Sequence, residues 1–264
     1  MDTEGKTPII VVKNLTARFG DNVVFENVNF QVYKGEILVI VGASGCGKST
    51  LLKIMIGLQK PYAGQVLYQG TDIVSADEKE LNQYRQNIGV LFQSAALFSS
   101  MTLKENIELP LQEYTDLNPA VIDTIIKMKL GMVNLAGYEN HQPSELSGGM
   151  KKRAGIARAM ALDPRVLFFD ELSAGLDPVT AAELDDLIIK TNDALGTTMV
   201  IVTHELESIY KIAHRVLMLD KEAKGIIAEG KPIDLKNNSS DPRVMSFFLR
   251  QRPVEAVEKR FYVS

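Results

Sequence analysis

The feature that most constrains the fold of this 264-residue chain is a glycine-rich segment at positions 42–49. It fits the P-loop pattern G-x-x-x-x-G-K-[ST], and it reads Gly42-Ala43-Ser44-Gly45-Cys46-Gly47-Lys48-Ser49. A short apolar run, Glu36 to Val41, precedes it, and a helical segment, Ser49 to Ile56, follows it. A loop between a buried strand and a helix is the context in which this pattern binds phosphate. The sequence therefore predicts a nucleotide site built on an α/β fold.

The residue types in this segment suit that chemistry. Glycines let the loop curl so that successive backbone N–H groups face an anion, and the next helix directs its positive end to the same point. Lys48 can reach the β- and γ-phosphates, and the Ser49 hydroxyl can ligate Mg²⁺. Cys46 occupies a free position of the pattern, where a small filler is a better interpretation than a redox role. We expect nucleotide contacts from Gly42, Ala43, Ser44, Gly45, Cys46, Gly47, Lys48, Ser49 and Thr50.

A pair of carboxylates ends another apolar run. Val166 to Phe169 has the pattern of a buried strand, and Asp170 and Glu171 follow it directly. Such strand ends lie at the carboxyl edge of an open α/β sheet, where these folds bind ligands. Asp170 suits a Mg²⁺ shell, and Glu171, pointing in a different direction, can polarise an attacking water. Alone the pair could equally be a solvated turn, but beside a P-loop it predicts hydrolysis.

The order of the expected elements indicates the architecture. Two β-rich runs parted by a Gly-Asp-Asn turn, Ile9 to Phe19 and Val23 to Val32, predict an antiparallel hairpin. Strands then alternate with helices, which implies a mainly parallel sheet with helices on both faces. We expect further strands at Glu36 to Val41, Val66 to Tyr68, Ile88 to Phe92, Val166 to Phe169, Thr198 to Val202, Arg215 to Leu219 and Gly225 to Ala228, and helices at Ser49 to Ile56, Gly148 to Ala161, Val179 to Asn192 and Leu206 to Ala213.

Composition excludes several classes of protein. Twenty-nine Lys and Arg against 33 Asp and Glu give a net charge of −4, which argues against general nucleic-acid binding. The single cysteine excludes an intramolecular disulfide framework and suits a reducing compartment. The longest apolar run has strand length, far short of the roughly 20 residues of a membrane span. The first eight residues lack the apolar core of a secretory signal. We expect a chain that does not itself cross a membrane.

A third motif identifies the family that the chain resembles. Leu146-Ser147-Gly148-Gly149-Met150 opens a helix upstream of the carboxylate strand, with Ser147 as a good N-cap. In this order with a P-loop and two carboxylates, it resembles the signature motif of ABC ATPases, the nucleotide-binding subunits of ABC transporters. The resemblance covers about residues 8–235. It implies a mainly parallel P-loop core with an antiparallel β subdomain. The pattern along the chain is helical from Thr102 to Leu146, which predicts a helical subdomain inserted at about 95–147 of a domain spanning 1–240, with 241–264 as a C-terminal extension.

The resemblance assigns further residues. Phe19 lies where the family stacks an aromatic ring on adenine, although a strand-end core residue would look the same. Gln93 matches the Q-loop glutamine, and Asp177 belongs to a D-loop match, Ala174-Gly175-Leu176-Asp177. His204 matches the switch histidine that contacts the γ-phosphate, although a lone histidine after a strand is more often a cap. Leu172 departs from the family, which usually has proline there.

The resemblance also implies that two copies of the chain share each ATP in a head-to-tail sandwich. One copy would supply Lys48, Ser49, Gln93 and Asp170, and the other Ser147, Gly148, Gly149 and Asp177. The catalytic residues are then Glu171, His204, Lys48 and Gln93, and the Mg²⁺ ligands Ser49, Gln93 and Asp170. The expected cofactors are ATP and Mg²⁺.

Three kinds of ABC protein fit this pattern: a transporter subunit, a translation or repair ATPase, and a regulatory module without turnover. A single domain without a heptad tract, with Glu171 and His204 in place, favours the transporter subunit. Three segments resemble the sequences of Mla-type (MCE-associated) phospholipid transport ATPases: residues 91–98, residues 143–150 and the tail Asp241-Pro242-Arg243-Val244. The alternative is a subunit of an importer or exporter of a polar solute.

The same resemblance implies the partners. We expect transmembrane permease subunits and a lipid-binding MCE-type subunit, with this chain peripheral on the cytoplasmic face of the inner membrane. The apolar cluster Ala95, Ala96, Leu97, Phe98 and Met101 is either buried in the helical subdomain or the surface on which a permease helix docks. The extension, 241–264, either packs on its own domain or reaches the second subunit.

Overall fold

The computed structural model describes residues 7–250, and within them a six-stranded sheet forms the centre of the fold. Its order is β10-β9-β3-β8-β7-β6, in which β9, β3, β8, β7 and β6 run parallel and β10 is antiparallel to β9. The strands are β3 (Ile37–Val41), β6 (Ile88–Leu91), β7 (Val166–Asp170), β8 (Thr198–Val202), β9 (Arg215–Asp220) and β10 (Gly225–Gly230). The predicted α/β class with a mainly parallel sheet is confirmed.

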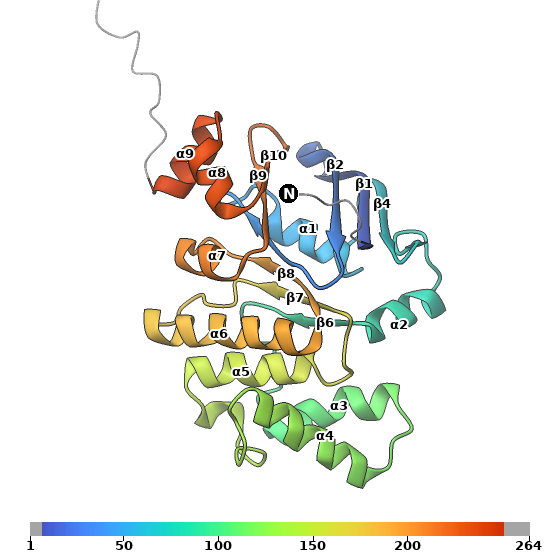
Figure 1. The fold of residues 1–264 in the computed structure, drawn as a ribbon. Coiled ribbons are helices and arrows are strands. Elements are labelled where there is room, and N and C mark those ends of the chain that lie inside the picture. Colours follow the sequence, from blue (N-terminus) through green and yellow to red (C-terminus); the bar gives the residue numbers. More distant parts are fainter. Residues whose placement is uncertain (1–6, 251–264) are drawn as a thin grey trace, which may run out of the picture.

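A second, antiparallel sheet lies beside the first, in the order β2-β1-β4-β5 (Figure 1). The expected hairpin is its main part, and the strands are β1 (Pro8–Phe19), β2 (Asn22–Tyr33), β4 (Ala63–Tyr68) and β5 (Thr71–Asp72). Its apolar face shares one hydrophobic cluster with the helix that follows the P-loop, α1 (Lys48–Met55). This sheet is the antiparallel β subdomain expected from the sequence.

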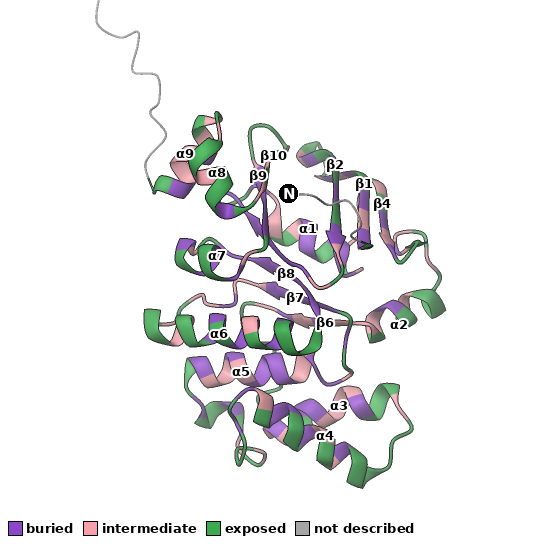
Figure 2. Cartoon of the chain, viewed as in Figure 1, coloured by how far each residue is buried: buried purple, intermediate pink, exposed green. Residues whose placement is uncertain are grey.

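Alternate residues of the central strands face two separate cores, because side chains along a strand point to opposite faces. In β7, Val166 and Phe168 join the cluster around α1, whereas Leu167 and Phe169 join the cluster on the opposite face. That opposite face is covered by α5 (Gly148–Ala159), α6 (Pro178–Leu195) and α7 (Leu206–Ile212). Figure 2 shows the central strands buried, α5 mostly buried or intermediate, and exposed residues along the outer face of α6. Burial on both faces explains the nearly continuous apolar strand sequences.

The region between the two halves of the core is helical and packs on α5. It comprises α3 (Leu103–Tyr114), α4 (Pro119–Met132) and a 3₁₀ turn, η1 (Pro143–Glu145). Thr102 begins α3 with a capping box to Glu105, and Asn118 caps α4 ahead of Pro119. In Figure 1 these helices lie on the side of α5 away from the central sheet. The inserted helical subdomain expected from the sequence is therefore present.

Three helices and a short strand had no counterpart among the expected elements. The helices are α2 (Glu78–Gln86), α8 (Pro232–Asn238) and α9 (Pro242–Leu249), and the strand is β5. In α9, Val244 and Phe248 are buried in the same cluster as α5 to α7, and Arg243 forms an ion pair with Asp220 at the end of β9. Residues 251–264, which hold most of the expected extension, lie outside the described residues. None of the helices described is long and apolar enough to span a bilayer.

A buried ion pair joins the two sheets. Arg215, the first residue of β9, donates to Glu36 through Nη2 at 2.5 Å and Nε at 3.2 Å, and Nη2 also reaches the Gln31 carbonyl of β2 at 2.6 Å. Its guanidinium also contacts Glu229 of β10 and lies 5.0 Å from the ring centre of Tyr33. Both partners of the Arg215–Glu36 pair are 5% exposed, so solvent screens the charges little.

Replacement of Arg215 by Met should lower the free energy of unfolding by about 3–5 kcal/mol, because it leaves the Glu36 carboxylate buried without its partner. Urea denaturation at pH 7 measures this loss. The double variant Glu36→Gln, Arg215→Met removes both charges and should recover part of it. A loss below about 1 kcal/mol in the single variant would show that the pair behaves like an exposed one.

Candidate nucleotide-binding and catalytic site

Four neighbouring parallel strands end at one edge of the central sheet, and each end carries a predicted site residue. The P-loop follows β3, His204 follows β8, Asp170 and Glu171 end β7, and Gln93 follows β6. The strands lie in the spatial order β3-β8-β7-β6. Residues far apart in the sequence are therefore brought together because parallel strands place their carboxyl ends on the same side.

The P-loop backbone depends on glycine at particular positions. Gly42 has a φ of 144°, and a Cβ there would lie 2.2 Å from the Leu219 carbonyl oxygen. Lys48 turns back over the loop, and its Nζ donates to the carbonyl oxygens of Gly42 at 2.8 Å and Ala43 at 3.1 Å. Cys46 donates its N–H to Ala43 at 3.3 Å, its side chain is buried, and burial raises the pKa of its thiol. The thiol is therefore neutral packing, in line with the filler interpretation.

A cavity of about 810 Å³ opens along this edge. Among its lining residues are twelve that the sequence predicted, namely Phe19, Gly42, Ala43, Ser44, Gly45, Gly47, Lys48, Ser49, Thr50, Gln93, Glu171 and His204. Phe19 is the last residue of β1, at the β1–β2 turn, and it is 56% exposed, so it is not a core residue. An exposed aromatic ring beside a phosphate loop is suited to stack on a base.

The two carboxylates have different surroundings. Asp170 lies 3.4 Å from the Ser49 hydroxyl through Oδ1, and burial raises its pKa, an effect that a bound cation would oppose. Oε2 of Glu171 lies 2.8 Å from Nδ1 of His204. Its backbone is left-handed, with a φ of 53°, and its N–H donates to the Val202 carbonyl of β8 at 2.9 Å. The two adjacent acids therefore point to separate tasks.

The donor set fits Mg²⁺ bound together with a nucleotide. The described residues contain no group of three His, Cys, Asp or Glu side chains that could hold a metal alone. Mg²⁺ commonly takes only one or two carboxylates and completes its shell with waters and substrate phosphates. Asp170 and Ser49, with Gln93 on the cavity wall, meet that requirement.

The signature and D-loop residues lie outside the cavity, at the starts of two neighbouring helices. Ser147 caps α5 and accepts from Met150 N–H at 3.3 Å. Gly149 packs so closely on α6 that a Cβ would lie 2.4 Å from Thr180 Cγ2. Asp177 caps α6 and accepts from the Thr180 hydroxyl at 2.6 Å, and its hydrogen bonds to Thr180 and Val179 lower its pKa. These residues are therefore held rigidly at a second surface of the same chain.

Three further residues on the cavity wall were not predicted from the sequence, namely Asn22, Val24 and Phe247. Asn22 and Val24 begin β2, directly after the turn that carries Phe19, so their place follows from the hairpin. Phe247 comes from α9, and its ring packs edge-on against Phe248 at 5.2 Å between ring centres. The Asp241-Pro242 helix start followed by apolar residues was a sequence signal for α9 itself, and not for the place of Phe247 on the cavity wall.

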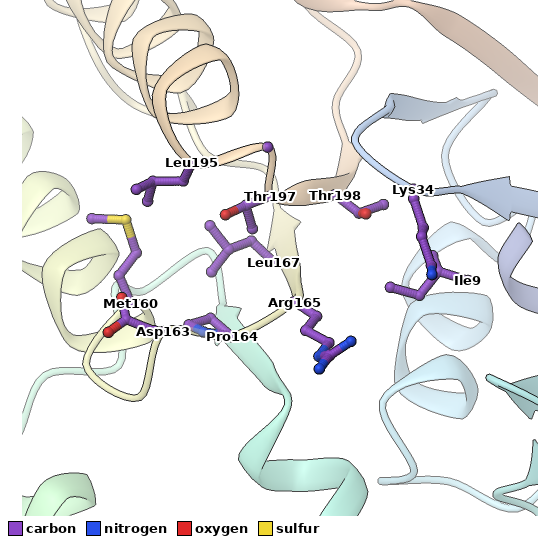
Figure 3. Close-up of a pocket in the computed structure, with 11 residues that line it drawn as sticks. Ile9, Lys34, Met160, Asp163, Pro164, Arg165, Leu167, Leu195, Thr197 and Thr198 are labelled. Carbon is purple, nitrogen blue, oxygen red and sulfur yellow. The ribbon is translucent and has the colours of Figure 1, made fainter. Parts of the chain in front are cut away.

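A second cavity, of about 330 Å³, lies at the opposite edge of the sheet (Figure 3). Arg165 immediately precedes β7, and Thr198 begins β8, so this cavity faces the amino ends of the strands. Lys34 and Ile9 complete the wall from the antiparallel sheet side. Ligands of open α/β sheets bind at the carboxyl ends, and the predicted P-loop, Gln93, Glu171 and His204 lie there instead.

Comparisons with known proteins agree with this geometry. The ABC transporter family model matches residues 25–174. The phospholipid transport ATP-binding protein MlaF of Haemophilus influenzae is 42% identical over 90% of this chain and 89% of its own. The probable ribonucleotide transport ATP-binding protein mkl of Mycobacterium leprae is 41% identical over 94% of this chain and 72% of its own. The dimeric ATP-binding cassette MJ0796, solved in a post-hydrolysis state with ADP and Pi, superimposes with a TM-score of 0.76 at 33% identity. That match covers 84% of this chain and 98% of the cassette. The chain belongs to the ABC transporter family and is one of its ATP-hydrolysing cassettes.

Proposed function

We propose that this chain is the ATP-hydrolysing subunit of a phospholipid transporter and drives lipid movement across the cell envelope. The observation that carries the proposal is that the P-loop, Glu171 and His204 line one cavity at the carboxyl edge of the central sheet. The identity to MlaF, a phospholipid transport protein by its name, supports the choice of cargo.

Nucleotide binding would use the P-loop and the mouth of the cavity. Phe19 would stack on adenine, and the loop amides would surround the phosphates. The Lys48 ammonium, which donates to the Gly42 and Ala43 carbonyls in this structure, would neutralise the β- and γ-phosphates. Ser49, Asp170 and Gln93 would hold Mg²⁺, which neutralises phosphate charge when bound.

Hydrolysis would use Glu171 as the carboxylate that orients and deprotonates the attacking water. His204, 2.8 Å from that carboxylate, can restrain its rotamer and reach the γ-phosphate from the same strand edge. Positive charge from Lys48 would meet the negative charge that develops on the transferred phosphoryl group. Each role follows from a side chain that lines the cavity.

A second copy of the chain would complete the site. Ser147, Gly148 and Gly149 lie outside the cavity, at a helix start whose amides can face an anion. The similar MJ0796 cassette is dimeric with ADP and Pi bound, which supports the pairing of two copies. In that pair the signature loop and Asp177 of one copy would cover the nucleotide on the P-loop of the other.

Glu171→Gln should lower ATP turnover by about 10²–10⁴-fold, because an amide cannot accept the proton of the attacking water. ATP binding should persist, so the variant should accumulate as an ATP-bound dimer. Steady-state phosphate release and size-exclusion chromatography with ATP measure the two effects. Glu207→Gln, on an exposed carboxylate of α7, is the matched control and should behave as the parent. Turnover at the parent rate in Glu171→Gln would show that Glu171 is not the catalytic carboxylate.

The membrane partners would dock beyond Gln93. Ala95, with a buried side chain, and Ala96 both have left-handed backbones, and they lead to Phe98, which is 45% exposed. The guanidinium of Arg158 lies 4.7 Å from the centre of the Phe98 ring and holds it in place. A fixed, exposed aromatic ring suits a permease helix. The chain would then be peripheral, on the cytoplasmic face of the inner membrane, with an MCE-type lipid-binding subunit in the same complex.

A polar solute is the second candidate cargo. The mkl protein, named as a probable ribonucleotide transport subunit, is 41% identical to this chain, close to the value for MlaF. The two candidates share every proposed role in the ATP site. They differ in the permease and in the molecule that it carries. The molecules that copurify with this chain therefore distinguish a phospholipid cargo from a polar solute.

Purification of the chain from its detergent-solubilised native membrane should yield a permease with bound phospholipid, identified by mass spectrometry. Phe98→Glu should lose the permease yet keep ATP binding, because the new carboxylate can pair with Arg158 without disturbing the cavity. Leu195→Glu, 48% exposed at the end of α6, is the matched control and should retain the permease. A permease with a soluble solute-binding protein and no lipid would replace the phospholipid proposal by the polar-solute one.

A further inference from the structure

Lys152 is a buried charged residue of α5, with 6% of its surface exposed. Its ammonium donates to the backbone carbonyl oxygens of Gln93 and Glu171, the second at 3.4 Å. Burial lowers the pKa of Lys152, and the charges of Glu171 and Asp170 oppose that effect. Because a buried ammonium is unfavourable unless it is hydrogen-bonded, the two carbonyls account for its position. Both belong to residues whose side chains line the nucleotide cavity.

The two carbonyls lie just past the end of a parallel strand pair. The last paired residues of β6 and β7 are Leu91 and Phe169, so Gln93 and Glu171 each come two residues later. Gln93 and Glu171 therefore lie beyond the paired residues of β6 and β7. Lys152, with three N–H donors, spans the gap and ties the two segments to one point on α5.

The same face of α5 holds the rest of the segment after Gln93. Arg158 donates to the Ala96 carbonyl and packs on the Phe98 ring. Gly155 lies close to Leu91 and to the main chain of Ala95: a Cβ at Gly155 would be 2.4 Å from Leu91 Cδ1 and 3.0 Å from the Ala95 carbonyl oxygen. Residues at spacings of three on a helix share a face. Lys152, Gly155 and Arg158 therefore form one continuous contact that sets the path of this segment.

We propose that Lys152 is a positioning residue for ATP hydrolysis, which holds the main chain of Gln93 and Glu171 so that their side chains are placed correctly in the cavity. The proposal rests on the proposed function of the cavity. The Lys152 ammonium donates to two backbone oxygens and does not line the cavity, so it contributes to turnover through the two residues that it fixes. Its loss should affect the chemical step more than the binding of ATP.

Lys152→Met, which keeps the side-chain length without the donors, should lower kcat by about 10–100-fold, since small misplacements of catalytic groups have effects of this size. The KM for ATP, and the affinity for a fluorescent ATP analogue measured at equilibrium, should stay within about twofold of the parent, well below that change in kcat. Lys152→Arg keeps a multiple donor and should recover a large part of kcat. If Lys152→Met does not fold, Lys152→Gln, whose amide can reach one carbonyl, replaces it in the comparison.

The matched control is Lys129→Met. Lys129 is 1% exposed on α4 and pairs with Asp163, which lines the cavity at the opposite edge of the sheet (Figure 3). Losing this buried ammonium should lower the melting temperature and leave kcat unchanged. Amide hydrogen exchange in residues 92–98 and 171–176 should accelerate in Lys152→Met and not in Lys129→Met.

Two results would overturn the proposal. One is a kcat in Lys152→Met equal to that of the parent or of Lys129→Met at matched stability. The other is exchange in residues 92–98 and 171–176 that is no faster than in the control. A parent chain that hydrolyses no ATP would instead contradict the proposed function, and the exchange comparison would still decide whether Lys152 holds these segments.

Discussion

The parallel pairing of β3, β8, β7 and β6 is the constraint on which the site depends. Ile40 and Asp170 both pair with Val202, and Leu91 pairs with Phe169, so the strands end nearly level. The P-loop, the acids, the histidine and the glutamine each begin within two residues of those ends. A slip of one residue would turn every strand side chain to the opposite face. Because both faces are buried, such a slip would exchange the two apolar cores as well, and the register is held firmly.

This dependence explains how much of the fold and site could be predicted from the sequence. The P-loop and the Val166–Asp170 strand carry strong local signals, since the eight-residue P-loop pattern between a strand and a helix, and an apolar run that ends in two acids, seldom occur together by chance. Twelve predicted residues line the cavity because they stand at strand ends or in the P-loop and helix start that follow β3, which a sequence pattern marks well. Ser147, Gly149 and Asp177 lie elsewhere in the chain, at helix starts. Their roles remain predictions that a dimer would test.

The missed parts lacked a periodic apolar signal or depended on distant contacts. In α2 the one buried residue is Tyr84, so no apolar stripe exists, although Asp77 and Glu80 form a capping box that is visible in the sequence. The α9 helix has only two buried residues, Val244 and Phe248. The place of Phe247 on the cavity wall arises from how α9 packs on the core, which no local pattern contains. Likewise, a lysine in a helix is normally solvated, so nothing local marks Lys152 as buried.

Glu171 shows how the main chain controls the chemistry of this edge. Its left-handed backbone costs on the order of 1–3 kcal/mol and persists only when the surroundings hold it. Three contacts do so: its N–H bonds to Val202, its carbonyl accepts from Lys152, and the next side chain, Leu172, is buried in the core. A residue before proline is confined mainly to extended conformations. Leucine at 172 therefore permits this backbone where proline would oppose it, and the direction of the carboxylate depends on packing around Glu171 as well as on His204.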